Sequence, residues 1–357
     1  MKLTQKKIDD LNVQVTLEIA ADDYEASRKK KLSERRRTAD FKGFRKGNAP
    51  MSLIERVYGE QALMEAVNDV ISDALNDFIK KSKLRLVGEP LASEEQSENE
   101  WAPGKDFTFK FDLAQTPEIT LAPGKDDKVT LYTIGVTETA KKEMKGNMLK
   151  QIGTFKKGEK EGDKGEIVPA EANQESFDRL FGPDKVHDEK EFDAAVEERL
   201  VANYAQEADY RLGKDIREYL VSKADVKLPE AFLKRWLIKM NEGKFSAEEV
   251  EKDFPAFLSD FRWQLVREHL MGLYKIKVEG KDIQEAAESY VAYQYAMYGI
   301  ANVPEDMIKE AAGRILSDER QGRQIEESVE EQKVIAAVKE VITISKKKIT
   351  VEKFRAL

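Results

Sequence analysis

The basic loop, residues 43–50, is the part of the sequence whose residue types and spacing best suit binding chemistry. Gly43 and Gly47 allow backbone angles that other residues avoid, so the chain can turn sharply at both positions. Phe44 is then held outward, with Arg45 and Lys46 directly after it. An exposed ring beside two cations can enter a pocket while the cations meet carboxylate or phosphate. The candidate binding residues of this loop are Gly43, Phe44, Arg45, Lys46, Gly47 and Pro50.

The basic loop lies in a strongly positive stretch of an acidic chain. Residues 28–56 contain eleven Lys or Arg and three Asp or Glu, a net charge of +8, whereas the 357-residue chain has a net charge of −8. Such a basic pole predicts one docking end for an anionic partner. Only Phe41 and Phe44 lie among these cations, so reading of an RNA sequence is not expected. A free nucleic-acid-binding protein is therefore the weaker interpretation.

Residues that could catalyse a reaction are scarce. The sequence has no Cys, which excludes disulfides, zinc–thiolate sites and thiol nucleophiles. Its two histidines, His187 and His269, have no nucleophile motif near them, and a phosphate-binding Gly-x-x-x-x-Gly-Lys-Ser/Thr loop is absent from the sequence. We therefore predict no catalytic residue, no metal, no cofactor and no action driven by ATP.

The elements that must position the basic loop are predicted as a small α+β domain over residues 1–115. Alternating apolar residues indicate strands at 11–19 and 107–113, and a shorter strand at 84–87. A helix capped by Asp22 or Asp23 runs toward Arg37, and Pro50 suits the first turn of a second helix. The apolar face of the second helix consists of Leu63, Val67, Val70, Ala74 and Phe78.

The rest of the chain is predicted to be a connector, residues 116–167, and a helical domain, residues 168–357. The connector contains an extended segment at 129–136, a helix at 137–152 and a turn or flexible link at 153–166. Apolar residues then recur mostly every four positions from Phe192 to Leu220, which indicates a helix of about ten turns. Further helices are expected at 229–242, 257–274, 282–298, 304–317 and 324–341, and residues 346–354 have no clear pattern. The predicted fold class is an α+β N-terminal domain followed by a mainly α-helical C-terminal domain, in an elongated multidomain chain.

The string Gly43-Phe-Arg-Lys-Gly-Asn-Ala-Pro50 resembles the Gly-Phe-Arg-x-Gly-x-x-Pro signature of the bacterial trigger factor family. Tyr58-Gly59 and the order of the predicted elements are also similar to that family. The resemblance implies docking of the N-terminal domain on the large ribosomal subunit, on an exit-tunnel protein and nearby rRNA. It further implies that the C-terminal helices form two projecting arms, which hold nascent or unfolded polypeptides without ATP. A homodimer is a further partner that the resemblance allows.

The helices that resemble the arms carry Met and aromatic residues at helical spacing. Ordinary helix–helix packing explains most such residues, but Met and aromatic side chains also suit contact with varied partners. The candidate client-binding residues are Leu233, Trp236, Leu237, Met240, Tyr293, Met297, Tyr298 and Met307.

One feature departs from the resemblance. Most members of the family insert an FKBP-like prolyl isomerase domain after the extended connector, and here that position holds only residues 153–166. So short a stretch cannot bury a core, so we predict no isomerase activity. A divergent prolyl isomerase and a helical holdase without a ribosomal role are the alternatives. Residues 1–10 lack the apolar core of a secretion signal, and no window is apolar enough to span a membrane, so we expect a cytoplasmic protein without membrane partners.

Overall fold

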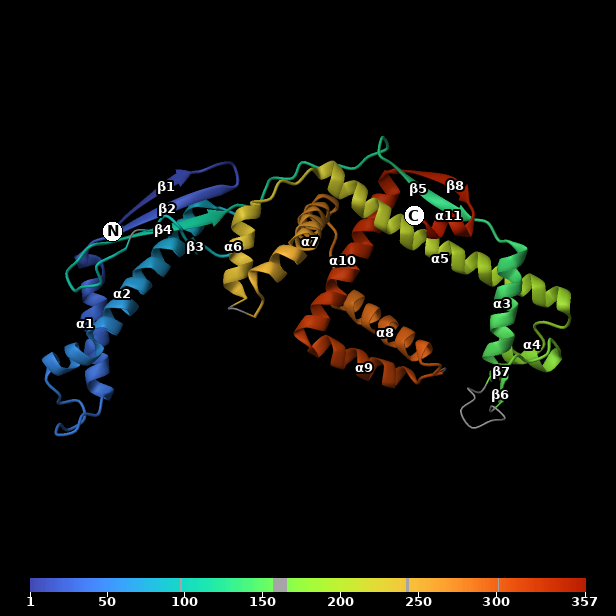
Figure 1. Cartoon of the computed structure of the whole chain (residues 1–357), viewed down its shortest axis with the longest axis horizontal. Helices are drawn as coiled ribbons and strands as arrows, with labels where there is room; N and C mark the ends of the chain where they lie inside the picture. Colours follow the sequence, from blue (N-terminus) through green and yellow to red (C-terminus); the bar gives the residue numbers. More distant parts are fainter. Residues whose placement is uncertain (97, 157–165, 242–243, 301) are drawn as a thin grey trace. The chain divides into compact units, whose positions relative to one another are not determined.

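The computed structural model describes residues 1–96, 98–156, 166–241, 244–300 and 302–357. Its contacts divide the chain into two compact units. The first unit combines Met1–Ile119 with Val226–Arg262, and the second combines Thr120–Asp225 with Trp263–Leu357. The predicted fold class is confirmed, because mixed strands and helices precede a mostly helical remainder (Figure 1). The domain boundaries at residues 115 and 168 stay a prediction.

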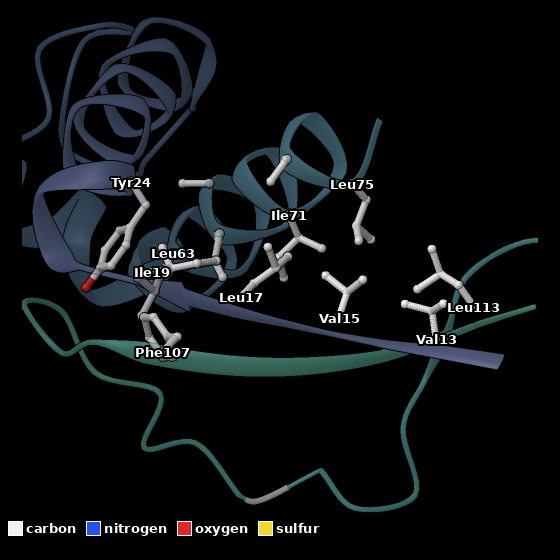
Figure 2. Packing of buried hydrophobic residues seen from close by; sticks show 13 residues of the cluster. Val13, Val15, Leu17, Ile19, Tyr24, Leu63, Ile71, Leu75, Phe107 and Leu113 are labelled. Carbon is white, nitrogen blue, oxygen red and sulfur yellow. The ribbon is translucent and has the colours of Figure 1, made fainter. Parts of the chain in front are cut away.

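The first unit contains a four-stranded antiparallel sheet in the order β1-β2-β4-β3. The strands are β1 (Lys2–Lys7), β2 (Asn12–Ile19), β3 (Leu91–Ala92) and β4 (Phe107–Ala114). In β2 the alternation seen in the sequence sends Val13, Val15, Leu17 and Ile19 into the core. Figure 2 shows these side chains pointing from the sheet toward α2.

Two helices connect β2 to β3 and present the basic loop between them. They are α1 (Ala21–Thr38) and α2 (Met51–Ser82), which pack against each other. Leu63, Val67 and Ile71 of α2 cover the sheet, and Tyr24 of α1 contacts Phe107 with ring centroids 5.4 Å apart. The predicted apolar face of α2 is therefore confirmed, and this core anchors both ends of the basic loop.

Two local predictions about this unit are wrong, and one of its strands was missed. The segment 84–87 is not a strand, because only Leu86 forms an isolated bridge, with Gln115. Strand β1 was not predicted because it is an edge strand whose one inward apolar residue is Leu3. Helix α1 begins after Ala20, so neither Asp22 nor Asp23 is the cap residue. Asp23 is the third residue of the helix, and its carboxylate accepts a hydrogen bond from the Ala20 amide at 2.8 Å.

The first unit also includes α6 (Glu230–Met240), which packs on β4. Arg235 forms an ion pair with Asp112 of β4 at 2.9 Å, and the indole of Trp236 lies over Gly88. Helix α7 (Ala247–Tyr274) starts ten residues before its predicted start at residue 257, because it accommodates Pro255 within its early turns.

The second unit is built around α5 (Glu189–Ala224), and the predicted ten-turn helix is confirmed. Its buried stripe consists of Phe192, Val196, Leu200, Tyr204, Ala208, Leu212, Ile216 and Leu220. A two-stranded parallel sheet of β5 (Lys128–Ile134) and β8 (Thr343–Ile349) accompanies it, with β5 in contact with α5. Short elements complete this part of the unit: α3 (Glu138–Gln151), β6 (Thr154–Lys156), β7 (Glu166–Val168), α4 (Gln174–Phe181) and α11 (Val351–Arg355).

Two segments without a regular pattern in the sequence contain strands. The predicted flexible link begins and ends in β6 and β7, which pair antiparallel, while its residues 157–165 lie outside the described residues. In the segment 346–354, whose sequence has no clear pattern, residues 346–349 belong to β8 and residues 351–354 belong to α11. Strands β6 and β7 are three residues long and β8 is mostly exposed, so their sequences lack the alternation of a half-buried strand.

Three further helices of the second unit are α8 (Gly280–Met297), α9 (Glu305–Ser317) and α10 (Glu319–Val341). Helices α8 and α9 form a hairpin and pack through a small core that includes Ala287, Val291 and Ala312. Figure 1 shows this hairpin next to α10. All three helices were predicted, with ends that differ by up to five residues.

Candidate functional site

The basic loop is a pair of tight turns with left-handed glycines. Gly43 has φ +95° and Gly47 has φ +83°, a region that favours residues without a side chain. The Phe44 amide donates to the Phe41 carbonyl at 3.0 Å, and the Asn48 amide donates to the Arg45 carbonyl at 2.8 Å. Pro50 occupies the cap position before α2, one residue outside its predicted place in the first turn.

The base of the loop is fixed by α1 and α2. The Arg36 guanidinium donates from Nε to the Ala49 carbonyl at 2.8 Å, and Ala49 packs in a small buried cluster with Leu32 and Ile54. The Phe41 ring meets the Tyr58 ring edge-on, with centroids 6.2 Å apart. These contacts order both limbs of the loop, so less conformational freedom is lost when the loop binds a partner.

The tip of the loop is exposed. The Phe44 side chain is 43% exposed, and Lys42, Arg45 and Lys46 are exposed as well. Among the described residues, none of these three cations forms an ion pair with an acid. The ring and its flanking cations are therefore available to another molecule.

Other cations of the +8 stretch are already occupied. Arg28 pairs with Glu25 at 3.1 Å and with Glu55. Lys31 pairs with Asp69 at 2.8 Å. Arg35 pairs with Glu65 at 2.9 Å. Asp69 and Glu65 both lie on α2, and the sequence alone did not connect them with the cations of α1. Among the described residues, the loop cations Lys42, Arg45 and Lys46 stay without an acidic partner, as do the exposed Lys30 and Arg37 of α1.

The candidate client-binding residues on α6 divide into core and surface. Leu233 is 1% exposed, so it is a packing residue of the first unit. Trp236 and Leu237 are half-buried, and Met240 is exposed. Periodicity alone could not separate these cases, because inward and outward apolar residues of one helix have the same spacing.

The candidates on α8 and α9 are all exposed. Met297 is 70% exposed and Tyr298 is 82% exposed, while the opposite side of the hairpin holds its core. Ile300, in the turn between the helices, belongs with them but was not predicted because it lies outside any helical pattern. We call this surface the α8–α9 apolar patch, and its residues are Tyr290, Tyr293, Met297, Tyr298, Ile300 and Met307. Several exposed apolar side chains on one helical hairpin are typical of an interaction site.

A polar cluster around the buried Asp127 in the second unit was not singled out from the sequence. The Asp127 carboxylate accepts hydrogen bonds from the Tyr219 hydroxyl, the Lys223 ammonium and, at 2.8 Å, the Gly124 amide. Burial would raise the pKa of the Asp127 carboxyl, but the bonds from Lys223 and Tyr219 outweigh burial and lower this pKa below its usual value. Asp127 directly precedes β5, and Tyr219 and Lys223 belong to α5, so these hydrogen bonds link the start of β5 to α5.

Neither histidine adjoins a reactive group. One ring nitrogen of His269, Nε2, lies 2.7 Å from the Leu121 carbonyl, and the His187 backbone amide donates to Glu191. Within the described residues, no group of three or more His, Cys, Asp or Glu could hold a metal ion. None of the described helices combines the length and apolarity needed to cross a membrane.

Two family models match the chain. "Bacterial trigger factor protein (TF)" matches residues 1–148, and "Probable trigger factor, C-terminal domain" matches residues 208–357. The chain is 30% identical over 155 residues to the trigger factor of Glaesserella parasuis serovar 5, covering 43% of this chain and 35% of that protein. It is 34% identical over 136 residues to the trigger factor of Lachnoclostridium phytofermentans, covering 37% and 31%. The chain thus spans about a third of the length of the curated relatives it matches.

A solved structure has the same overall fold. It was described under "Promiscuous Substrate Recognition in Folding and Assembly Activities of the Trigger Factor Chaperone". The match has a TM-score of 0.53 and 14% sequence identity, and it covers 95% of this chain and 99% of the other. At this identity the match shows the fold alone.

Proposed function

We propose a function from the premise that this chain belongs to the trigger factor family. In this proposal the chain is a cytoplasmic chaperone that docks at the polypeptide exit of the large ribosomal subunit. The basic loop makes the contact, and the helical part shields nascent or unfolded chains without ATP.

The exposed ring of Phe44 beside the unpaired Arg45 and Lys46 is the observation that carries the docking proposal. In this proposal the Phe44 ring enters a pocket of an exit-tunnel protein and contributes to the binding free energy mainly because it leaves water. Arg45 and Lys46 form charge-assisted hydrogen bonds with carboxylates of that protein or with phosphates of rRNA. The ordered base of the loop supports the same role, because a fixed ring and fixed cations match one partner geometry.

Ribosome co-sedimentation tests the docking proposal. The F44A/R45A/K46A variant removes an aromatic and a cationic anchor, each of a type that costs about 2 kcal/mol or more when truncated. We therefore expect the dissociation constant for ribosomes to rise at least about 30-fold, since 1.4 kcal/mol corresponds to tenfold.

The matched control is Y210A/K150A/K190A, which removes one exposed ring and two exposed cations from the second unit. The control should sediment with ribosomes as the parent does. Unchanged co-sedimentation of F44A/R45A/K46A would show that the basic loop is not the docking element.

Client binding is proposed for the α8–α9 apolar patch and, on α6, for the exposed Met240 and the accessible parts of the half-buried Trp236 and Leu237. The support is that exposed Tyr and Met side chains can adapt to many apolar segments. Self-association, which would cover such a patch off the ribosome, is compatible with this proposal. The absence of prolyl isomerase activity stays a prediction, which a proline-containing peptide assay checks.

A further inference from the structure

The end of the second unit carries a second basic surface, formed by the edge strand β8 and the short helix α11. Residues 343–357 contain five Lys or Arg and one Glu, a net charge of +4 in a chain whose net charge is −8. We call this the β8 basic surface, and its residues are Lys346, Lys347, Lys348, Lys353 and Arg355. All five side chains are exposed.

The lysines of the β8 basic surface have no acidic partners. Within the part of the chain that the structure describes, Lys346, Lys347, Lys348 and Lys353 form no ion pair, whereas Lys141, Lys145 and Lys333 elsewhere in the same unit do. Glu352 is the acid within the segment. Hydrogen bonds from its own backbone amide and from Thr350 lower the pKa of its carboxyl, and the charge of Arg355 makes a smaller contribution in the same direction. Consecutive unpaired cations repel one another, so an anionic partner would relieve that repulsion.

The position of β8 leaves this charge open to a partner. Among the described residues, β8 pairs with β5 alone, with Lys346 opposite Leu131 and Lys348 opposite Thr133. The other edge of β8 is therefore unpaired. Successive side chains of a strand point to opposite faces, so Lys346 and Lys348 lie on one face of the sheet and Lys347 lies on the other. Helix α11 adjoins β5 through the Phe354 and Tyr132 rings, 6.0 Å apart.

We propose that the β8 basic surface binds the phosphodiester backbone of RNA. A phosphate chain has a negative charge at every nucleotide, which matches a row of adjacent cations without neutral gaps. Four of the five cations of the surface are Lys, a residue that is depleted in protein interfaces. The two rings that the structure places beside this surface, Tyr132 and Phe354, are half-buried and contact each other, so they are not free to stack on bases, and binding should not depend on sequence. The inference does not rest on ribosome docking by the basic loop.

Fluorescence anisotropy with a labelled 20-nucleotide uridine oligomer tests this inference. Every protein is the full chain carrying K29Q, K30Q, K42Q, R45Q and K46Q, which lowers the net charge of residues 28–56 from +8 to +3 and so reduces the contribution of that region. We expect the further change K346Q/K347Q/K348Q to weaken binding roughly 50-fold at 0.15 M salt. The slope of log affinity against log salt should fall by about 2, at about 0.7 for each lysine on a single strand.

Two matched variants separate charge from fold. K142Q/K150Q/K190Q makes the same charge change at exposed lysines of α3 and α5 and should have a much smaller effect. K346R/K347R/K348R keeps the charge and should keep the affinity. Circular dichroism melting of each protein checks that it is folded.

Three outcomes would overturn the inference. The background protein could fail to bind the oligomer, or K346Q/K347Q/K348Q could weaken binding no more than the control. The latter is expected if the lysines only keep the free edge of β8 from pairing with another chain, and the glutamine variant would then self-associate. The third outcome is that polyglutamate with the same charge as the RNA oligomer binds the protein more tightly than the RNA does. That result would indicate an acidic protein as the partner.

Discussion

At the scale of single residues, the structure separates cations that look alike in the sequence. Arg28, Lys31 and Arg35 are bound by carboxylates of α1 and α2, but Arg45 and Lys46 are not bound by any acid among the described residues. The glycine spacing was enough to find the loop, because it requires left-handed turns at fixed positions. Pairing depends on which helix faces which, and a one-dimensional charge count does not contain that information.

Asp127 gives a residue-scale prediction for stability. Replacing Asp127 with Asn removes the charged acceptor of Lys223 and Tyr219, so we expect the free energy of unfolding at pH 7 to fall by about 1–3 kcal/mol. The native pKa of Asp127 lies below its unfolded value, so this stabilisation is complete above the unfolded pKa and is lost as pH falls through the native pKa. Urea unfolding at pH 7, 5 and 3 should therefore show a difference from the parent that shrinks only at the lowest pH.

The exposed neighbour Asp126 provides the control for this measurement. D126N should unfold like the parent throughout the pH range. A difference between D127N and the parent that persists undiminished into strong acid would contradict the assigned titration.

At the scale of elements, long amphipathic helices were predictable and short or exposed strands were not. The stripe from Phe192 to Leu220 determines α5, because only a helix brings residues four apart onto one face. Strands β1 and β8 have few inward apolar residues, and their pairing partners determine them instead. The partner of β8 is more than two hundred residues earlier in the chain, beyond the reach of any local pattern.

The packing of α6 gives an element-scale prediction. Gly88 has φ +71°, and a Cβ there would lie 2.9 Å from the Trp236 indole. Gly88→Ala should lower the free energy of unfolding of the first unit by about 2–4 kcal/mol, as the sum of backbone strain and overpacking. Urea unfolding followed by tryptophan fluorescence measures this loss.

Gly104→Ala is the matched control, because Gly104 has a similar φ of +78° but open space around its Cβ position. The control should lose only the backbone part, about 1–2 kcal/mol. Equal losses in both variants would mean that the Trp236 contact does not constrain the position.

At the scale of the whole molecule, one chain carries both an exposed basic loop and an exposed apolar patch, and the proposed chaperone function assigns a role to each. We expect the full chain to suppress aggregation of a chemically unfolded enzyme without nucleotide. Y293S/M297S/Y298S removes three exposed apolar side chains from the α8–α9 apolar patch, so several-fold more protein should be needed for the same suppression. Light scattering during dilution from denaturant measures this requirement.

V201S/Y210S/L273S removes three exposed apolar side chains from other surfaces of the second unit and serves as the control. If both variants lose the same activity, suppression depends on general surface apolarity and not on this patch. No suppression by the parent would contradict the chaperone proposal itself.

The pairing of β5 with β8 also has a consequence for how the protein is made. Residues 128–134 leave the ribosome long before residues 343–349 are synthesised, so the parallel sheet cannot form while translation of the intervening chain continues. Closing so long a loop makes this step slow compared with local helix formation. During its own biosynthesis, a chain proposed to protect other newly made polypeptides must itself wait, with one strand unpaired, for its last pairing partner.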